Sequence, residues 1–117
     1  CPVDQDGPGG NVYVGCVAVA MAQVMYYWGY PEVGWGEHGY YAGSYGYQFA
    51  DFSNTFYDFE NMENNYATEA SQLLLYQAGV SVNMGYSPDG SGASVMGGSN
   101  SAYSAMRNYF IFIFVEI

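Results

Sequence analysis

The chain contains no lysine, and Arg107 is its single arginine. Eleven aspartate and glutamate residues therefore leave a formal net charge of -10 at pH 7. A protein of this charge repels the phosphates of nucleic acids and the anionic head groups of lipids. The composition thus argues against nucleic acid and against a membrane surface as partners.

Cysteine and histidine are also scarce, with two and one residues respectively in 117. Two cysteines do not make a disulfide scaffold, although a bridge between Cys1 and Cys16 remains an alternative. One histidine supplies one metal ligand, and the acids Asp4 and Asp6 lack most of the ligands of a calcium site. We therefore expect no metal and no cofactor.

What the chain has in abundance is apolar and aromatic residues, which make up 50% of it and include 14 tyrosines. This content argues against an acidic disordered tail and predicts one small packed domain over 1–117. From Cys16 to Trp28 nearly every residue is apolar or aromatic, and Gly29 and Pro31 follow as stop signals. This stretch predicts a central helix over 16–28, enclosed on every side and too short to cross a bilayer.

Cys16 is expected in the first turn of that helix, directly after Gly15. The unpaired amide groups and the positive end of the helix dipole favour a thiolate there, which is the chemistry of a cysteine nucleophile. The alternative is that Cys16 is only a small core residue.

The sequence around Cys16 is similar to the nucleophile segment of the streptopain family, the secreted papain-like cysteine peptidases of bacteria. The similarity extends in the family's order over most of residues 1–110. It is carried by 15–31 (GCVAVAMAQVMYYWGYP), 52–59 (FSNTFYDF), 77–84 (QAGVSVNM) and 86–93 (YSPDGSGA).

This resemblance implies an α+β papain-like fold, truncated to the mainly helical half that carries the nucleophile. It implies Cys16 as the catalytic residue and Tyr30, Gly90, Ser91 and Gly92 as residues of the substrate cleft, where loop backbone pairs with an extended peptide. A core aromatic and a plain linker are the alternatives for Tyr30 and for the loop. The family's catalytic histidine would lie beyond residue 117. We therefore expect a secreted enzyme whose partners are a peptide substrate and a missing C-terminal half.

His38 lies between glycines in Gly36-Glu37-His38-Gly39. Because the resemblance puts the family's catalytic histidine much further downstream, we interpret His38 as a surface or loop residue. The segment 32–65 around it is rich in glycine and aromatic residues and predicts short strands or ordered loops, with low complexity as the alternative.

Three further elements are expected after residue 65. A helix over 66–78 would be capped by Asn65, end at Gly79 and carry a stripe of Ala70, Leu73, Leu74 and Gln77. The alternation of Val80, Val82 and Met84 predicts a half-buried strand. Another helix would begin near Ser99 or Asn100, with Ala102, Ala105, Met106 and Tyr109 on its inner face.

The chain ends in the apolar segment 111–117 (IFIFVEI), where the family resemblance stops. Its high β-propensity predicts either a core strand or an aggregation-prone segment. This leaves a second hypothesis of another class, in which the chain is a non-catalytic fragment that self-associates through its aromatic, glycine-rich body and the 111–117 tail.

Overall fold

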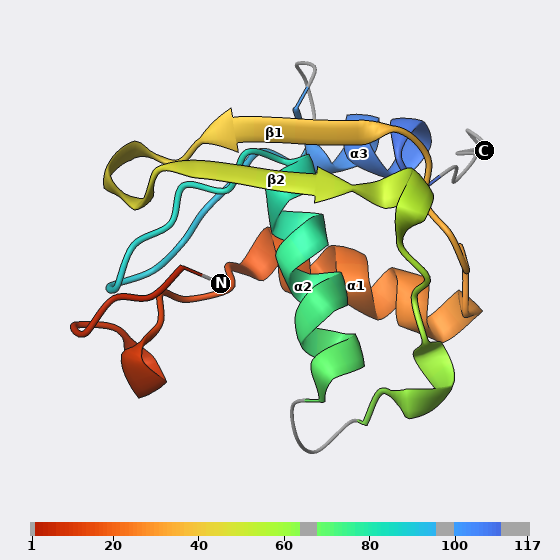
Figure 1. Cartoon of the computed structure of the whole chain (residues 1–117), viewed down its shortest axis with the longest axis horizontal. Coiled ribbons are helices and arrows are strands. Elements are labelled where there is room, and N and C mark those ends of the chain that lie inside the picture. The colour runs from red at the N-terminus through yellow and green to blue at the C-terminus, as the bar shows by residue number, and fades with distance from the viewer. Residues whose placement is uncertain (1, 64–67, 96–99, 111–117) are drawn as a thin grey trace.

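A computed structural model describes residues 2–63, 68–95 and 100–110 of the chain (Figure 1). Cys1 and the 111–117 tail lie outside these residues, and so do the predictions made for them. The main elements are α1 (Cys16–Trp28), β1 (Glu37–Tyr41), β2 (Tyr47–Asp51), α2 (Glu69–Ser81) and α3 (Ala102–Asn108). The fold is α+β, as predicted, and no helix of the described part is long and apolar enough to cross a membrane.

Helix α1 has the bounds that the sequence predicts. Gly29 ends it in the left-handed conformation, and its amide donates to the carbonyls of Met25 and Tyr26. The prediction that α1 is enclosed on every side is wrong, because Tyr27 and Trp28 are 78% and 67% exposed. In the described chain α1 packs mainly against α2 and α3, so only the face that meets them is buried.

Strands β1 and β2 form an antiparallel hairpin in which Glu37 pairs with Asp51 and Tyr41 with Tyr47. The prediction of short strands in this segment is confirmed. Figure 1 shows the hairpin lying across the end of α2, with α3 behind it. His38 lies in β1 and is half-buried, so its interpretation as a surface or loop residue is wrong.

Helix α2 begins and ends about three residues later than predicted. Its cap is Thr68, whose side chain accepts the Ser71 amide while the Ser71 hydroxyl accepts the Thr68 amide. The expected cap, Asn65, lies outside the described residues. On the predicted stripe, Leu74 is buried but Leu73 is 40% exposed.

The helix does not stop at Gly79, and the strand expected over residues 80–84 is not formed. Val80 belongs to α2, and Val82 is its C-terminal cap. A glycine inside a helix usually lowers its stability, but this one allows a close approach. A Cβ atom added to Gly79 would lie 2.5 Å from the Tyr86 hydroxyl, so the absence of a side chain lets Tyr86 pack against the helix.

Helix α3 is capped by Ser101 rather than by Ser99 or Asn100, because the Ser101 hydroxyl accepts the Ser104 amide. Its buried residues are Ala105 and Met106, as predicted. An aromatic cluster follows, in which the Tyr109 ring stacks on Phe52 at 4.6 Å and the buried Phe110 ring meets Phe52 at 5.3 Å. These contacts join the end of α3 to the turn after β2.

Candidate active site

Cys16 is the first residue of α1, and its thiol is free and exposed. Gly15 precedes it with φ 95°, a backbone conformation that is strained for residues that carry a side chain. The Gly15 carbonyl accepts the Val19 amide at 3.1 Å. The first turn of a helix leaves backbone amide groups without helical partners, and these groups favour negative charge. The Cys16 side chain therefore extends from the helix end at which these amide groups gather.

The loop after α2 packs directly against Gly15, the residue before Cys16. A Cβ atom on Gly15 would lie 2.6 Å from the Met84 sulfur and 3.1 Å from the Ser91 carbonyl oxygen. Gly15 is thus required both by its backbone angle and by this close approach. The contact brings the glycine- and serine-rich segment beside the N-terminus of α1, although about 70 residues separate the two in sequence.

The Ser91 hydroxyl holds this loop in place. It donates to the Tyr13 carbonyl at 2.6 Å and accepts the Ser87 amide at 3.1 Å. The Tyr13 amide in turn donates to the Ser87 carbonyl at 3.4 Å. Since its hydroxyl is engaged in these two bonds, Ser91 acts on the site by positioning the loop.

The two neighbouring glycines differ from each other. Gly92 exchanges both backbone hydrogen bonds with Gly85, at 2.8 and 3.2 Å, so its own N–H and C=O are used within the loop. Gly90 and Gly92 are both exposed, and a Cβ atom on either would meet nothing within 4 Å. The loop therefore presents an open surface beside Gly15, and its backbone is held at Gly92 by the hydrogen bonds to Gly85.

Tyr40 supports the same loop from the hairpin, because its hydroxyl donates to the Met84 carbonyl at 2.8 Å. The sequence did not single out Tyr13, Tyr40 or Met84 for the site. No local pattern marks them, since each acts through a partner that is distant in sequence.

Tyr30 lies beyond the opposite end of α1, after the Gly29 cap. A helix of 13 residues is about 20 Å long. The structure therefore does not bring Tyr30, which is 43% exposed, to Cys16.

His38 is likewise engaged away from Cys16. Its Nε2 lies 2.5 Å from the Asn83 side-chain oxygen, and its ring is 5.7 Å from that of Tyr109. Figure 1 shows β1 and α1 running in opposite directions, so the beginning of β1 lies over the end of α1 that is remote from Cys16. The described part of the chain thus contains a candidate nucleophile without an imidazole beside it.

The N-terminal acids do not form a metal centre. Asp4 accepts the Asp6 amide at 2.9 Å and the Tyr45 hydroxyl at 2.5 Å, and these bonds hold the pKa of Asp4 below its usual value, with the Tyr45 bond as the larger cause. Among residues 2–63, 68–95 and 100–110, no group of three acidic, histidine or cysteine side chains is arranged to hold a metal ion.

Comparison with known proteins shows which family and which solved structures share this sequence and fold. A sequence model described as the peptidase C10 family matches residues 1–116, so the expectation that the family resemblance stops before residue 111 is wrong. A cysteine-to-alanine variant of a prointerpain A fragment from Prevotella intermedia superposes with a TM-score of 0.74 and 35% identity, over 92% of this chain and 38% of that one. Active wild-type interpain A cysteine protease from the same organism superposes with a TM-score of 0.72 and 36% identity, over 93% of this chain and 47% of that one.

No curated protein sequence matches the chain. The superpositions confirm the predicted papain-like fold, and the chain spans less than half the length of either solved structure.

Proposed function

Because the chain belongs to the peptidase C10 family of cysteine peptidases, we propose that it is the nucleophile-bearing part of a cysteine endopeptidase. The observation that carries this proposal is the exposed Cys16 thiol at the start of α1, beside an open loop that Ser91 anchors. Gly15 allows both the entry into the helix and the approach of the loop.

In the proposed reaction the Cys16 thiolate attacks the carbonyl carbon of the scissile peptide bond. The oxygen becomes an oxyanion and accepts a hydrogen bond from the Cys16 backbone amide at the helix N-terminus. The C–N bond breaks as an imidazolium gives its proton to the leaving amine, and a thioester remains on Cys16. A water molecule, deprotonated by the same imidazole, hydrolyses the thioester and restores the thiol.

The imidazole in this scheme is supplied by residues outside this chain. His38 is the single histidine of the sequence, and its Nε2 contacts the side chain of Asn83, in the segment after α2. We infer that the chain alone does not turn over peptides efficiently, and that a C-terminal half with the catalytic histidine completes the site. The similarity to interpain A, of whose solved chain this one covers 47%, supports this inference.

The substrate is a peptide or protein that lies in extended form along the loop of Gly90, Ser91 and Gly92. The open space beside Gly90 and Gly92 allows a substrate backbone to come close. Since the Gly92 backbone is paired with Gly85, the substrate meets the loop at other backbone groups or by packing against its glycines. Tyr30 and Cys16 lie at opposite ends of α1. Tyr30 therefore contacts the substrate only if the cleft of the complete enzyme extends along the whole helix.

The working enzyme is proposed to be a secreted bacterial protein, as the family resemblance implies. The two superposed proteases come from the bacterium Prevotella intermedia, which supports a bacterial origin, and the secreted location rests on the family resemblance.

The proposal is tested by the pH dependence of alkylation with iodoacetamide, with any associated chain retained. We expect rapid labelling near pH 6 that disappears in Cys16→Ala, where Cys1 remains as an internal control thiol. An ordinary thiol has a pKa of about 8.5 and reacts slowly at that pH. Labelling of Cys16 that rises only above about pH 8 would contradict an assembled nucleophile.

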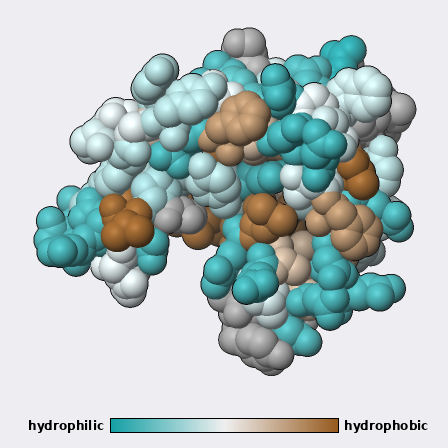
Figure 2. All heavy atoms as spheres, viewed as in Figure 1, coloured by the Kyte–Doolittle hydropathy of each residue, from teal (hydrophilic) through white to brown (hydrophobic). Residues whose placement is uncertain are grey.

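One observation favours self-association as a second candidate function. The rings of Tyr41, Tyr47 and Phe49 form an exposed row on the hairpin, with centroids 5.0 and 6.4 Å apart. On the face shown in Figure 2, however, the apolar side chains reach the surface at separate places rather than as one broad patch. Analytical ultracentrifugation of wild type and Tyr47→Ser over a range of concentrations tests this function. Self-association requires the apparent mass of the wild type to increase with concentration, and the substitution should reduce that increase.

A further inference from the structure

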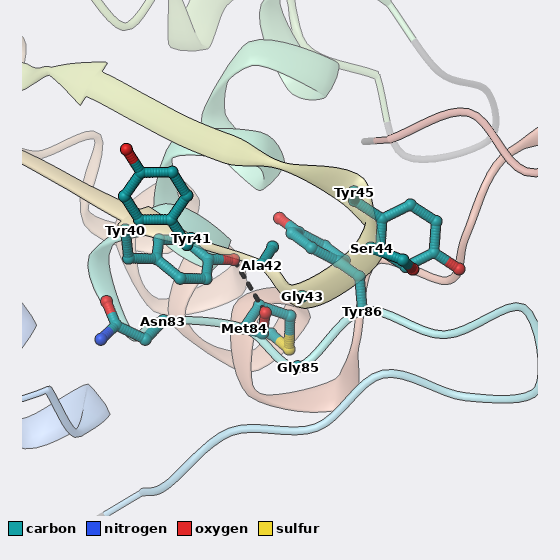
Figure 3. Close-up of a pocket in the computed structure, with 10 residues that line it drawn as sticks. All are labelled: Tyr40, Tyr41, Ala42, Gly43, Ser44, Tyr45, Asn83, Met84, Gly85 and Tyr86. Carbon is teal, nitrogen blue, oxygen red and sulfur yellow. Dashed lines mark hydrogen bonds between the residues drawn. The ribbon is translucent and has the colours of Figure 1, made fainter.

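Strand β1 is bonded to the segment after α2 at two neighbouring positions. His38 Nε2 lies 2.5 Å from the Asn83 side-chain oxygen. The Tyr40 hydroxyl points to the Met84 carbonyl and donates to it at 2.8 Å, the bond that Figure 3 marks. Residues 38 and 40 lie on one face of the strand, because side chains alternate along it. One face of the hairpin therefore holds residues 83 and 84.

Met84 connects this hairpin to the start of α1. Its side chain is fully buried, and its amide donates to the Gly79 carbonyl at 3.0 Å. A Cβ atom on Gly15 would lie 2.6 Å from the Met84 sulfur and 2.7 Å from its terminal methyl carbon. Gly15 is the N-terminal cap of α1, and Cys16 is the first residue of the helix. A displacement of Met84 would therefore act on the backbone before the Cys16 amide through a single packing contact.

Packing alone does not fix the backbone of residues 83 and 84. Tyr40 and Met84 line a pocket of about 540 Å³ between the hairpin tip and residues 83–86 (Figure 3). This open space allows the segment to shift if a bond to β1 is removed, which the neighbours in a close-packed core would prevent. Asn83 also has φ 52°, which is uncommon for residues other than glycine, and its side chain is held by His38. The bonds from β1 thus contribute directly to the position of this segment.

We propose that Tyr40 is a positioning residue for Cys16, and that it acts from β1 through Met84 and Gly15. This inference rests on the proposed function of Cys16 as a nucleophile. The amide groups in the first turn of a helix lower the pKa of a thiol only when they are directed at its sulfur. The conformation of Gly15 sets that direction, so the support of Met84 by Tyr40 affects how strongly the thiolate is stabilised. Burial raises the pKa of Tyr40, so its hydroxyl remains a donor at the pH values where a thiol titrates.

The test is the pH profile of iodoacetamide alkylation in the intact chain, measured on the peptide that contains Cys16. Tyr40→Phe removes only the hydroxyl group and should raise the midpoint of this profile by about 0.5–1 pH unit. Tyr76→Phe is the matched control, because its hydroxyl, on α2, donates to the Gln48 side chain of the same hairpin instead of to Met84. This control should leave the midpoint unchanged. A loss of stability alone would not move the midpoint of the folded protein.

Met84→Leu tests the route between the two residues. Leucine has a similar volume and keeps the carbonyl that Tyr40 bonds, but it lacks the sulfur and the terminal methyl group that face Gly15. Met84→Leu should raise the midpoint by itself, and the addition of Tyr40→Phe should then raise it little further. Additive shifts would overturn the proposed route, because they would show that Tyr40 acts on Cys16 in another way.

The backbone amide NMR signals of Gly15 and Cys16 separate this inference from the proposed function. Tyr40→Phe should shift both signals, and Tyr76→Phe should shift neither. A wild-type midpoint near the ordinary value of about 8.5 would contradict the nucleophile, while the two signals would still decide whether Tyr40 positions the start of α1. Unchanged signals and an unchanged midpoint in Tyr40→Phe, or equal changes in Tyr76→Phe, would overturn the inference whatever the wild-type midpoint is.

Discussion

The replacement of Gly79 by alanine in α2 tests how strongly a distant tyrosine controls this helix. Alanine normally stabilises a helix interior by roughly 0.5–1 kcal/mol relative to glycine. Here the added methyl carbon would lie 2.5 Å from the Tyr86 hydroxyl oxygen and 3.5 Å from the ring carbon that bears it. The first distance requires the buried tyrosine to move, so we expect Gly79→Ala to destabilise the protein by about 1–3 kcal/mol.

Tyr86→Phe removes the oxygen that obstructs the methyl group. The remaining ring carbon, at 3.5 Å, is in ordinary van der Waals contact. Because the hydroxyl has no well-formed hydrogen bond among the described residues, its loss should change the free energy of unfolding by less than about 0.5 kcal/mol or raise it slightly. In the Tyr86→Phe background, Gly79→Ala should then show its normal stabilising effect.

The assay is a double-mutant cycle of urea unfolding followed by circular dichroism. The two substitutions should have a coupling free energy of at least roughly 1.5 kcal/mol, with the double variant more stable than Gly79→Ala alone. Gly92→Ala is the control, because its methyl group meets nothing within 4 Å and should be tolerated. Additive effects, with coupling below about 0.5 kcal/mol, would refute the proposed contact.

Two further predictions concern the nucleophile segment and the N-terminal loop. Gly15→Ala should destabilise the protein by more than about 2 kcal/mol in the same assay, because it combines φ 95° with a methyl group 2.6 Å from the Met84 sulfur. Gly43→Ala has φ 55° but open space around it, so an equal loss there would exclude the Met84 contact as a cause. Tyr45→Phe should raise the pKa of Asp4 towards its ordinary value of 3.8, as followed by NMR titration. Because the pKa of Asp4 is lower in the folded state, its hydrogen bond with Tyr45 stabilises the fold at pH values above the unfolded pKa, near 3.9. This stabilisation is lost as the pH falls through the folded pKa of Asp4. Wild type and Tyr45→Phe should therefore converge in stability in acid, and an unchanged Asp4 titration would contradict the role of the bond.

Local signals were sufficient for α1. A long apolar run between Gly15 and the pair Gly29 and Pro31 gave correct bounds, because helix ends depend on the few residues at each end. The same reasoning located the start of α3 to within three residues and the hairpin to within its segment.

Local signals failed for α2 and for the enclosure of α1. Gly79 predicts the end of α2, but the helix continues through it to Ser81, and Tyr86 packs against the helix at this glycine. The apolar residues of α1 predicted cover on all sides, but the exposure of Trp28 depends on which other elements are present to pack against it. Neither effect can be predicted from hydrophobic periodicity, because the periodicity does not show which other elements pack against a helix.

The sequence by itself determined the class of the protein, the helix that carries Cys16 and the position of that thiol at a helix N-terminus. Only the tertiary structure decided that Met84 and Ser91 pack against Gly15, and that the Ser91 hydroxyl is turned inward to Tyr13. It also decided that His38 pairs with Asn83 and that Tyr30 lies at the far end of α1. The physical reason is range: a helix cap acts over about four residues, whereas these contacts join segments 45 to 78 residues apart in the chain.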